Sequence, residues 1–187
     1  MSSETLSIKL QPKQYKSAVK PVWCPGCGDF GVLGSITKAL AGLQIHPENA
    51  AIISGIGCSS RMPTYLGTYG FHGVHGRALA LATGLKTARP DLTVIATGGD
   101  GDGFSIGGNH FLHTARRNPD ITYIVMDNQV YGMTKGQASP TTEPNWQKGK
   151  LTPAGTGINP FQPLAIALAS GANFIARCSS SDSNGTA

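Results

Sequence analysis

Two turns with oxygen-bearing side chains carry the residues of this chain that are most suited to binding or catalysis. The first is Gly99-Asp100-Gly101-Asp102-Gly103, and the second places Asn128 28 residues after Asp100. Each turn follows an apolar, β-branched run (92–97 and 121–126), which predicts a buried strand. Oxygen-bearing side chains at strand ends suit a hard cation such as Mg²⁺, which often binds together with phosphates. The pattern predicts a magnesium–diphosphate site, and a glycine-rich turn in an ordinary nucleotide-binding sheet is the simpler alternative.

A helix is expected between these two strands. Residues 104–117 can form it, and Asn118-Pro119-Asp120 would end it. A strand–helix–strand unit brings both turns to the carboxyl edge of a parallel sheet, where open α/β sheets bind ligands. Two side-chain oxygens and one backbone carbonyl can then meet at one cation.

The rest of the chain alternates in the same way. We expect a first helix that Asp29 caps and that runs to about 42, further helices at about 78–88 and 160–169, and further strands at 50–54 and 173–176. A long loop, 129–159, is rich in Gly, Pro and Thr. This order predicts the α/β class, with an open, mostly parallel sheet that has helices on both faces.

The length and composition suit one folded domain. Residues 1–21 have the character of a polar arm, and 22–187 form the domain. A strand close to the end of a parallel sheet normally leads into another crossover, so we expect the domain to be incomplete at its C-terminus. The charged content is only 13%, which favours a surface covered in part by partner subunits.

Charge and cysteine content exclude several functional classes. The net charge of +5 is spread along the chain, and neither a basic stripe with aromatic residues nor zinc-finger spacing indicates nucleic acid. The sequence has no apolar run long enough to span a membrane and no signal-peptide core. Four cysteines without a secretory signal favour the reducing cytoplasm.

Three of the cysteines form a pattern of their own. Cys24 and Cys27 are a C-x-x-C pair, and Cys58 follows the strand expected at 50–54. A pair plus a remote third thiolate is compatible with an iron–sulfur cluster or with zinc. A thioredoxin-like redox pair is a third alternative, although that motif normally opens the helix of its own fold. Small buried cysteines without a bound metal are the remaining alternative.

Taken together, these motifs resemble the β subunit of 2-oxoacid:ferredoxin oxidoreductases, most of all the 2-oxoglutarate type (2-oxoglutarate synthase). The resemblance rests on three motifs and covers about 18–176: Gly-Asp-Gly…Asn, which is the thiamine diphosphate signature, Trp23-Cys24-Pro-Gly-Cys27-Gly, and Gly57-Cys58-Ser59-Ser60. It implies a thiamine diphosphate-binding fold and oxidative decarboxylation of a 2-oxoacid. Coenzyme A would accept the acyl group and ferredoxin the electrons. The signature usually ends in Asn-Asn, whereas this chain has Asp127-Asn128.

The resemblance also implies roles for individual residues. The side chains of Asp100 and Asn128 and the carbonyl of Val130 would bind Mg²⁺, and Lys135 would meet the substrate carboxylate as the catalytic residue. The residues implied in cofactor binding are Ile56, Gly57, Cys58, Ser59, His75, Gly76, Arg77, Ala78, Gly101, Asp102, Gly132 and Met133. From the residues alone, His75 could instead bond its own loop at the start of a helix, and Lys135 could simply be solvated.

Three ligands of a [4Fe–4S] cluster are implied by the same resemblance, namely Cys24, Cys27 and Cys58. The fourth cysteine of the family lies beyond the end of this chain. Cys178 could replace it, because it would follow the strand expected at 173–176.

The family places thiamine diphosphate between an α and a β subunit, and the α subunit supplies the acid that activates the aminopyrimidine. The N-terminal arm and the loop 129–159 are therefore expected to contact α or a second β subunit. The enzymatic alternatives are an indolepyruvate or pyruvate:ferredoxin oxidoreductase subunit and an enzyme of the acetolactate synthase group. A non-catalytic iron–sulfur electron-transfer module would explain the cysteines but not Asp100 and Asn128.

Overall fold

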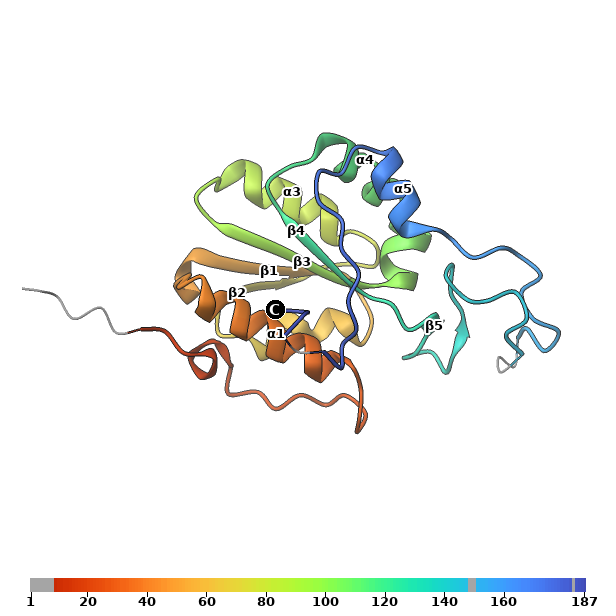
Figure 1. Cartoon of the computed structure of the whole chain (residues 1–187), viewed down its shortest axis with the longest axis horizontal. Coiled ribbons are helices and arrows are strands. Elements are labelled where there is room, and N and C mark those ends of the chain that lie inside the picture. Colours follow the sequence, from red (N-terminus) through yellow and green to blue (C-terminus); the bar gives the residue numbers. More distant parts are fainter. Residues whose placement is uncertain (1–8, 148–150, 183) are drawn as a thin grey trace, which may run out of the picture.

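The computed structural model describes residues 9–147, 151–182 and 184–187. Within them, four parallel strands form one sheet in the order β2-β1-β3-β4 (Figure 1). The strands are β1 (Ala50–Ser54), β2 (Tyr69–His72), β3 (Thr93–Gly99) and β4 (Thr122–Met126). Their parallel pairing directs all four carboxyl ends to the same edge of the sheet.

Helices cover both faces of this sheet, so the predicted α/β architecture is confirmed. One face packs against α1 (Asp29–Gly42) and the short α2 (Met62–Tyr65). The other packs against α3 (Ala78–Ala88), α4 (Gly108–Arg117) and α5 (Pro163–Ala169), which Figure 1 shows on the opposite side from α1. Because β1 is covered on both faces, all five of its residues are buried.

Local sequence explains most of these elements. In α1, Val32, Leu33, Ile36 and Leu40 recur at helical spacing and are all buried. The helix α4 ends at Asn118, which adopts the left-handed conformation that the expected turn requires. Asp29 was expected before the first helix and is instead its first residue.

Three sequence predictions about elements were wrong. The helix expected from residue 104 begins as a π-helical turn at Asp102–Ile106, and α4 starts only at Gly108. No strand forms at 173–176 in the described chain, because Ile175 packs on the core without a backbone partner strand. The loop 129–159 contains a short antiparallel pair, β5 (Val130–Tyr131) and β6 (Gln137–Ala138).

The described part of the expected polar arm packs against the domain. A 3₁₀ turn at Pro12–Tyr15 buries the Tyr15 ring completely. The Tyr15 hydroxyl lies 3.0 Å from the carbonyl oxygen of Leu40 and 2.7 Å from that of Ile45. Residues 1–8 of the arm lie outside the described residues. In the described part of the chain, no helix has the length and apolar character needed to cross a membrane.

Candidate functional site

The candidate site is built on the carboxyl edge of the sheet. Asp100 follows β3 directly, and Asp127 and Asn128 follow the neighbouring strand β4. The pairing of Gly99 with Met126 places these turns side by side. The predicted strand–helix–strand unit therefore brings the two halves of the motif together at adjacent strand ends.

Asp100 is buried, with 1% of its surface exposed. One of its carboxylate oxygens, Oδ2, accepts a hydrogen bond from the Thr141 hydroxyl at 2.8 Å. The same hydroxyl lies 2.8 Å from Oδ1 of Asp127. Burial raises the pKa of Asp100, the hydrogen bonds from Ser139 and Thr141 lower it, and the charge of Asp127 raises it further.

Thr141 reaches this position because the β5–β6 pair turns the chain back toward the sheet. Ser139, Thr141 and Thr142 are all buried, although they lie in what the sequence indicated as an irregular loop. The hydroxyl of Thr142 contacts the carbonyl of Gln129 and accepts from the backbone amide of Ser139 at 2.7 Å. The segment 139–142 is thereby fixed against the end of β4.

Asn128 and Val130 form a tight turn beside Asp100. The Asn128 side-chain oxygen accepts a hydrogen bond from the backbone amide of Val130 at 3.2 Å. Gln129 between them has a positive φ of 60°, and its amide donates to Asp127 at 3.0 Å. Of the two side chains that the sequence implies as cation ligands, Asp100 is buried and Asn128 is exposed to solvent.

Asp102 joins two loops that come from different strands. Its Oδ1 accepts hydrogen bonds from the backbone amides of Ile56 (2.9 Å) and Gly76 (2.8 Å), and lies 2.5 Å from Nδ1 of His75. The loops after β1 and β2, both implied in cofactor binding, are thus held together at the end of β3. The other oxygen, Oδ2, is buried without a hydrogen-bond partner among the described residues.

Close backbone approach around Asp102 explains some of the glycines. A Cβ on Gly55 would lie 2.1 Å from the Asp102 Oδ2. Gly76 has a φ of +71°, and a Cβ there would lie 2.7 Å from the amide nitrogen of Gly107 in the turn before α4. These positions tolerate only glycine without a shift of the neighbouring chain.

The start of α3 lies beside this cluster. Arg77 precedes the helix, and its Nη1 donates to the carbonyl of His75 at 3.2 Å. Helix N-termini present free amide groups, which makes them suited to anions. Tyr131 covers the other side, since its hydroxyl donates to the carbonyl of Gly101 at 3.3 Å and its ring lies 6.4 Å from that of His75.

Lys135 and Met133 lie in the exposed turn between β5 and β6. Lys135 has a positive φ of 79°. Gly132 is closer to the site, because a Cβ there would lie 3.5 Å from the Asn128 side-chain amide. Gly132 therefore lies beside the candidate ligand Asn128. Lys135 is exposed on the surface, and it is close to the candidate ligands in sequence.

The cysteine segments meet at the start of α1. The amide of Cys27 donates to the carbonyl of Cys24 at 3.0 Å, which closes the C-x-x-C turn. The indole of Trp23 donates to the carbonyl of Cys58 at 2.7 Å and so ties the two segments together. Burial raises the pKa of both the Cys27 and the Cys58 thiols, and the charge of the buried Asp29 adds to this.

These thiols do not form a closed metal site. Nowhere in the described residues do three Cys, His, Asp or Glu side chains converge as metal ligands. Cys178 is exposed, and the strand expected before it is not formed. The backbone two residues further on does pack on α1, because a Cβ on Gly31 would lie 2.1 Å from the carbonyl oxygen of Ser180.

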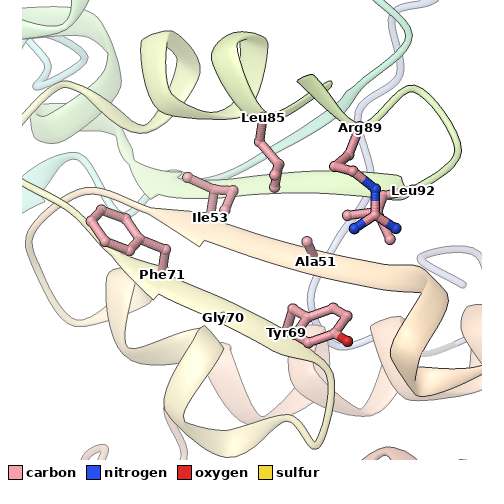
Figure 2. Close-up of a pocket in the computed structure, with 8 residues that line it drawn as sticks. All are labelled: Ala51, Ile53, Tyr69, Gly70, Phe71, Leu85, Arg89 and Leu92. Atoms are coloured by element: carbon pink, nitrogen blue, oxygen red, sulfur yellow. The ribbon is translucent and has the colours of Figure 1, made fainter. Parts of the chain in front are cut away.

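A separate cavity of about 300 Å³ lies over one face of the sheet. Figure 2 shows it between β1, β2 and the end of α3. Its lining residues are Ala51, Ile53, Tyr69, Gly70, Phe71, Leu85, Arg89 and Leu92. None of these lining residues belongs to the candidate site on the carboxyl edge of the sheet.

Comparison with known families decides what this edge is. Residues 55–186 match the family described as thiamine pyrophosphate enzyme, C-terminal TPP binding domain. The chain belongs to the thiamine pyrophosphate enzymes. The match includes the loops held by Asp102, the Asp100 turn and the Asn128 turn, so the carboxyl edge of the sheet belongs to the TPP-binding domain.

Individual relatives of this thiamine pyrophosphate enzyme chain are similar over most of its length. The 2-oxoglutarate oxidoreductase subunit KorB of Mycobacterium tuberculosis is 51% identical over 173 residues, which are 92% of this chain and 46% of the relative. The 2-oxoglutarate synthase subunit KorB of Methanocaldococcus jannaschii is 48% identical over 156 residues, 83% of this chain and 57% of the relative. The chain spans about half the length of these curated relatives.

A solved structure agrees closely with this thiamine pyrophosphate enzyme fold. It is 2-oxoglutarate:ferredoxin oxidoreductase from Magnetococcus marinus, with 2-oxoglutarate, coenzyme A and succinyl-CoA bound. The TM-score is 0.93 at 50% identity, over 95% of this chain and 60% of that chain. The expected resemblance to 2-oxoacid:ferredoxin oxidoreductase β subunits is confirmed.

Sequence reasoning missed Thr141 in this thiamine pyrophosphate enzyme site. A threonine in a long Gly- and Pro-rich loop carries no pattern of its own. The one available signal was the alternation of Val130-Tyr131 and Gln137-Ala138 around Gly132 and Gly136, which is typical of a short hairpin.

Proposed function

We propose that this chain is part of the β subunit of a 2-oxoacid:ferredoxin oxidoreductase that acts on 2-oxoglutarate. The reaction is the coenzyme A-dependent oxidative decarboxylation of the 2-oxoacid to acyl-CoA and CO₂, with ferredoxin as electron acceptor. The observation that carries the proposal is the family match over the carboxyl edge, where Asp100 and Asn128 end neighbouring strands.

The residues at this edge fit thiamine diphosphate with Mg²⁺. Asp100, Asn128 and the carbonyl of Val130 offer oxygen atoms, which Mg²⁺ prefers. A Cβ on Gly101 would lie 2.2 Å from the Tyr131 ring, so glycine at this position lets Tyr131 pack against the turn that carries Asp100. When bound, thiamine diphosphate supplies the electron sink for decarboxylation.

The surrounding residues would orient the diphosphate and keep it in place. Arg77 and the first amides of α3 supply positive charge and donors. Asp102 fixes the loop 56–59 and the loop 75–78 against each other, so that both reach the same group. Gly132 and Met133, which follow β5 directly, would contact the bound cofactor from that side.

The substrate assignment follows the relatives. The curated relatives are named for 2-oxoglutarate, and the Magnetococcus marinus structure contains 2-oxoglutarate and coenzyme A. Lys135 would pair with the carboxylate of the substrate when the exposed turn 132–136 faces it. A partner α subunit would cover this open edge and exclude water from it.

Cys24, Cys27 and Cys58 would contribute three thiolates to a [4Fe–4S] cluster. The Trp23 hydrogen bond to Cys58 supports this, because it brings the two cysteine segments together. The remaining ligand must come from outside these three. Such thiols persist in the reducing cytoplasm, where we place the enzyme.

The test is a binding and activity assay on the intact enzyme, purified anaerobically with its α subunit. We expect thiamine diphosphate to bind only with Mg²⁺, and ferredoxin reduction to need both 2-oxoglutarate and coenzyme A. Asp100→Ala should abolish binding of the cofactor, whereas Asp120→Ala, on the opposite edge of the sheet, should not. Activity with pyruvate or indolepyruvate in preference to 2-oxoglutarate would overturn the substrate assignment. Cofactor binding that is independent of Mg²⁺ would overturn the site.

A further inference from the structure

Asp127 stands where the thiamine diphosphate signature usually has asparagine, and the proposed ligand set gives its negative charge no role. Its Oδ1 accepts a hydrogen bond from the Gln129 amide at 3.0 Å, which an asparagine oxygen would do equally well. Its position is nevertheless specific. Its Oδ1 lies 2.8 Å from the Thr141 hydroxyl, and that hydroxyl is 2.8 Å from Oδ2 of Asp100. One threonine oxygen therefore stands between two carboxylates that come from adjacent strands.

The hydroxyl cannot satisfy both carboxylates. A threonine hydroxyl carries one proton, so it donates to Asp100 or to Asp127 but not to both at the same time. In the part of the chain that the structure describes, the ion pairs involve neither aspartate. Two negative charges thus approach one oxygen, and one of them, Asp100, is almost fully buried. Without a cation this arrangement is electrostatically unfavourable.

Thr141 is held in this position by its own loop. Its hydroxyl is 3.3 Å from that of Ser139, and the next residue, Thr142, is bonded to the carbonyl of Gln129 beside Asp127. Thr141 and Thr142 are both buried. The hydroxyl is thus positioned by the fold and does not depend on a free rotation of a surface side chain.

We propose that Asp127 is a second carboxylate of the divalent-cation site and that Thr141 is the positioning residue that couples it to Asp100. This inference rests on the proposed function and goes beyond its ligand set. Asp127 adds negative charge that strengthens binding of the cation, and Thr141 fixes the orientation of the Asp100 carboxylate. Partners of metal ligands typically change metal affinity by about 10–100-fold when they are replaced.

A charge role and a merely structural role predict different results in the absence of a cation. If Asp127 only stabilised its turn, Asp127→Asn would leave the melting temperature in EDTA nearly unchanged, because the asparagine oxygen still accepts from the Gln129 amide. If Asp127 repels Asp100, the same substitution raises the melting temperature in EDTA and reduces the increase that the cation produces. Asp127 is exposed and asparagine has the same shape, so the variant is expected to fold.

The experiment uses the intact enzyme with saturating thiamine diphosphate, with Mn²⁺ as an EPR-visible probe and Mg²⁺ in parallel. We expect Asp127→Asn to weaken Mn²⁺ binding about tenfold and to raise the melting temperature in EDTA. Thr141→Val should also weaken Mn²⁺ binding, and Thr141→Ser, which keeps the hydroxyl, should restore it. Glu143→Gln is the matched control, because it removes one exposed negative charge from the same loop and should change neither value.

Two results would overturn the inference while the proposed function stands. One is Mn²⁺ affinity of Asp127→Asn within about twofold of the wild type. The other is a melting temperature of this variant in EDTA that is equal to or lower than that of the wild type. If the wild type itself shows no cation-dependent binding of thiamine diphosphate, the proposed function fails and the inference fails with it.

Discussion

The Nδ1 atom of His75 lies 2.5 Å from the Oδ1 atom of Asp102. Asp102 is buried, whereas the His75 side chain is 39% exposed. If Nδ1 carries the proton it donates to Asp102, and the Nε2 atom of the ring is then left as an acceptor. The pair thus joins the interior of the sheet edge to the surface where a ligand would bind, and both partners can be tested separately.

Replacing Asp102 should be more harmful than replacing His75. Asp102→Asn weakens three hydrogen bonds to a carboxylate, and we expect the free energy of unfolding to fall by about 2 kcal/mol or more. His75→Gln leaves the Ile56 and Gly76 amides bonded, so its cost should be about 1 kcal/mol or less. Urea unfolding of both variants measures this, and equal losses would contradict the role of Asp102 in joining the two loops.

The space around Asp102 gives a second prediction. Gly55→Ala would put a Cβ 2.1 Å from the Asp102 Oδ2, and should cost about 1–3 kcal/mol of stability through crowding. Gly84→Ala is the matched control, since Gly84 lies inside α3 with nothing within 4 Å of its Cβ position. That substitution should stabilise by about 0.5–1 kcal/mol through helix propensity. Thermal unfolding would disprove the expectation if both changes had the same sign.

The sequence predicted the parts of this fold that are determined locally. Apolar runs indicated β1, β3 and β4, and Asn118 correctly marked the end of α4. The strand β2 was missed because Tyr69–His72 is short, contains a glycine and is exposed, so it shows no buried run. The strand expected at 173–176 failed for the opposite reason, since an apolar segment becomes a strand only where a neighbouring strand offers its edge.

The parts of the candidate site that could be predicted are likewise those determined by local sequence. The placement of Asp100 and Asn128 at neighbouring strand ends could be predicted because each follows a recognisable strand. The contact of Thr141 with Asp100 could not be predicted, because the two residues are 41 positions apart in the sequence and meet only when a loop folds back. The three hydrogen bonds of Asp102 likewise join loops whose distance no sequence pattern reports.

Trp23 should control the accessibility of Cys58. Trp23→Phe removes the indole donor of the 2.7 Å hydrogen bond to the Cys58 carbonyl, and should cost about 1 kcal/mol of stability. We expect Cys58 to be alkylated faster in the iron-free Trp23→Phe variant than in the iron-free wild type. Mass spectrometry of the alkylated protein measures this rate. Tyr65→Phe is the control, because its hydroxyl accepts from Val22 and not from the Cys58 segment. Unchanged labelling of Cys58 in Trp23→Phe would refute the expectation.

Asp29 predicts a pH dependence of stability in the iron-free protein. Burial raises the pKa of Asp29, and the hydrogen bond from the Cys27 thiol only partly opposes this. Folding therefore favours the protonated carboxyl: its contribution to stability is complete below the unfolded pKa of about 3.9 and is lost as the pH rises through the folded pKa. Asp29→Asn should raise the melting temperature at about pH 7 and have little effect near pH 3.

Asp91, an exposed aspartate whose pKa is lowered and not raised, serves as the control for Asp29. The hydrogen bonds and charge of Arg89 lower the pKa of the exposed Asp91. Its small contribution is present above the unfolded pKa and is lost as the pH falls, so Asp91→Asn should not stabilise the protein at neutral pH. If both variants shifted the melting temperature in the same direction, burial would not be the cause at Asp29.

The strand order β2-β1-β3-β4 has a kinetic consequence. In every parallel pair of this sheet, a connection that contains a helix separates the two strands. The pair of β1 and β3, for example, joins Ala50 to Thr93, which is far along the chain. No pair in this sheet is a hairpin, so the sheet cannot form by local strand pairing. The entropic cost of closing each long connection must be met before the stabilising contacts between strands can form. We expect refolding on the slow side for a chain of this size, with unpaired strand edges exposed to other chains in the meantime. Fast capture of the β2 or β4 edge during synthesis would therefore matter more for the yield of this protein than for its final stability.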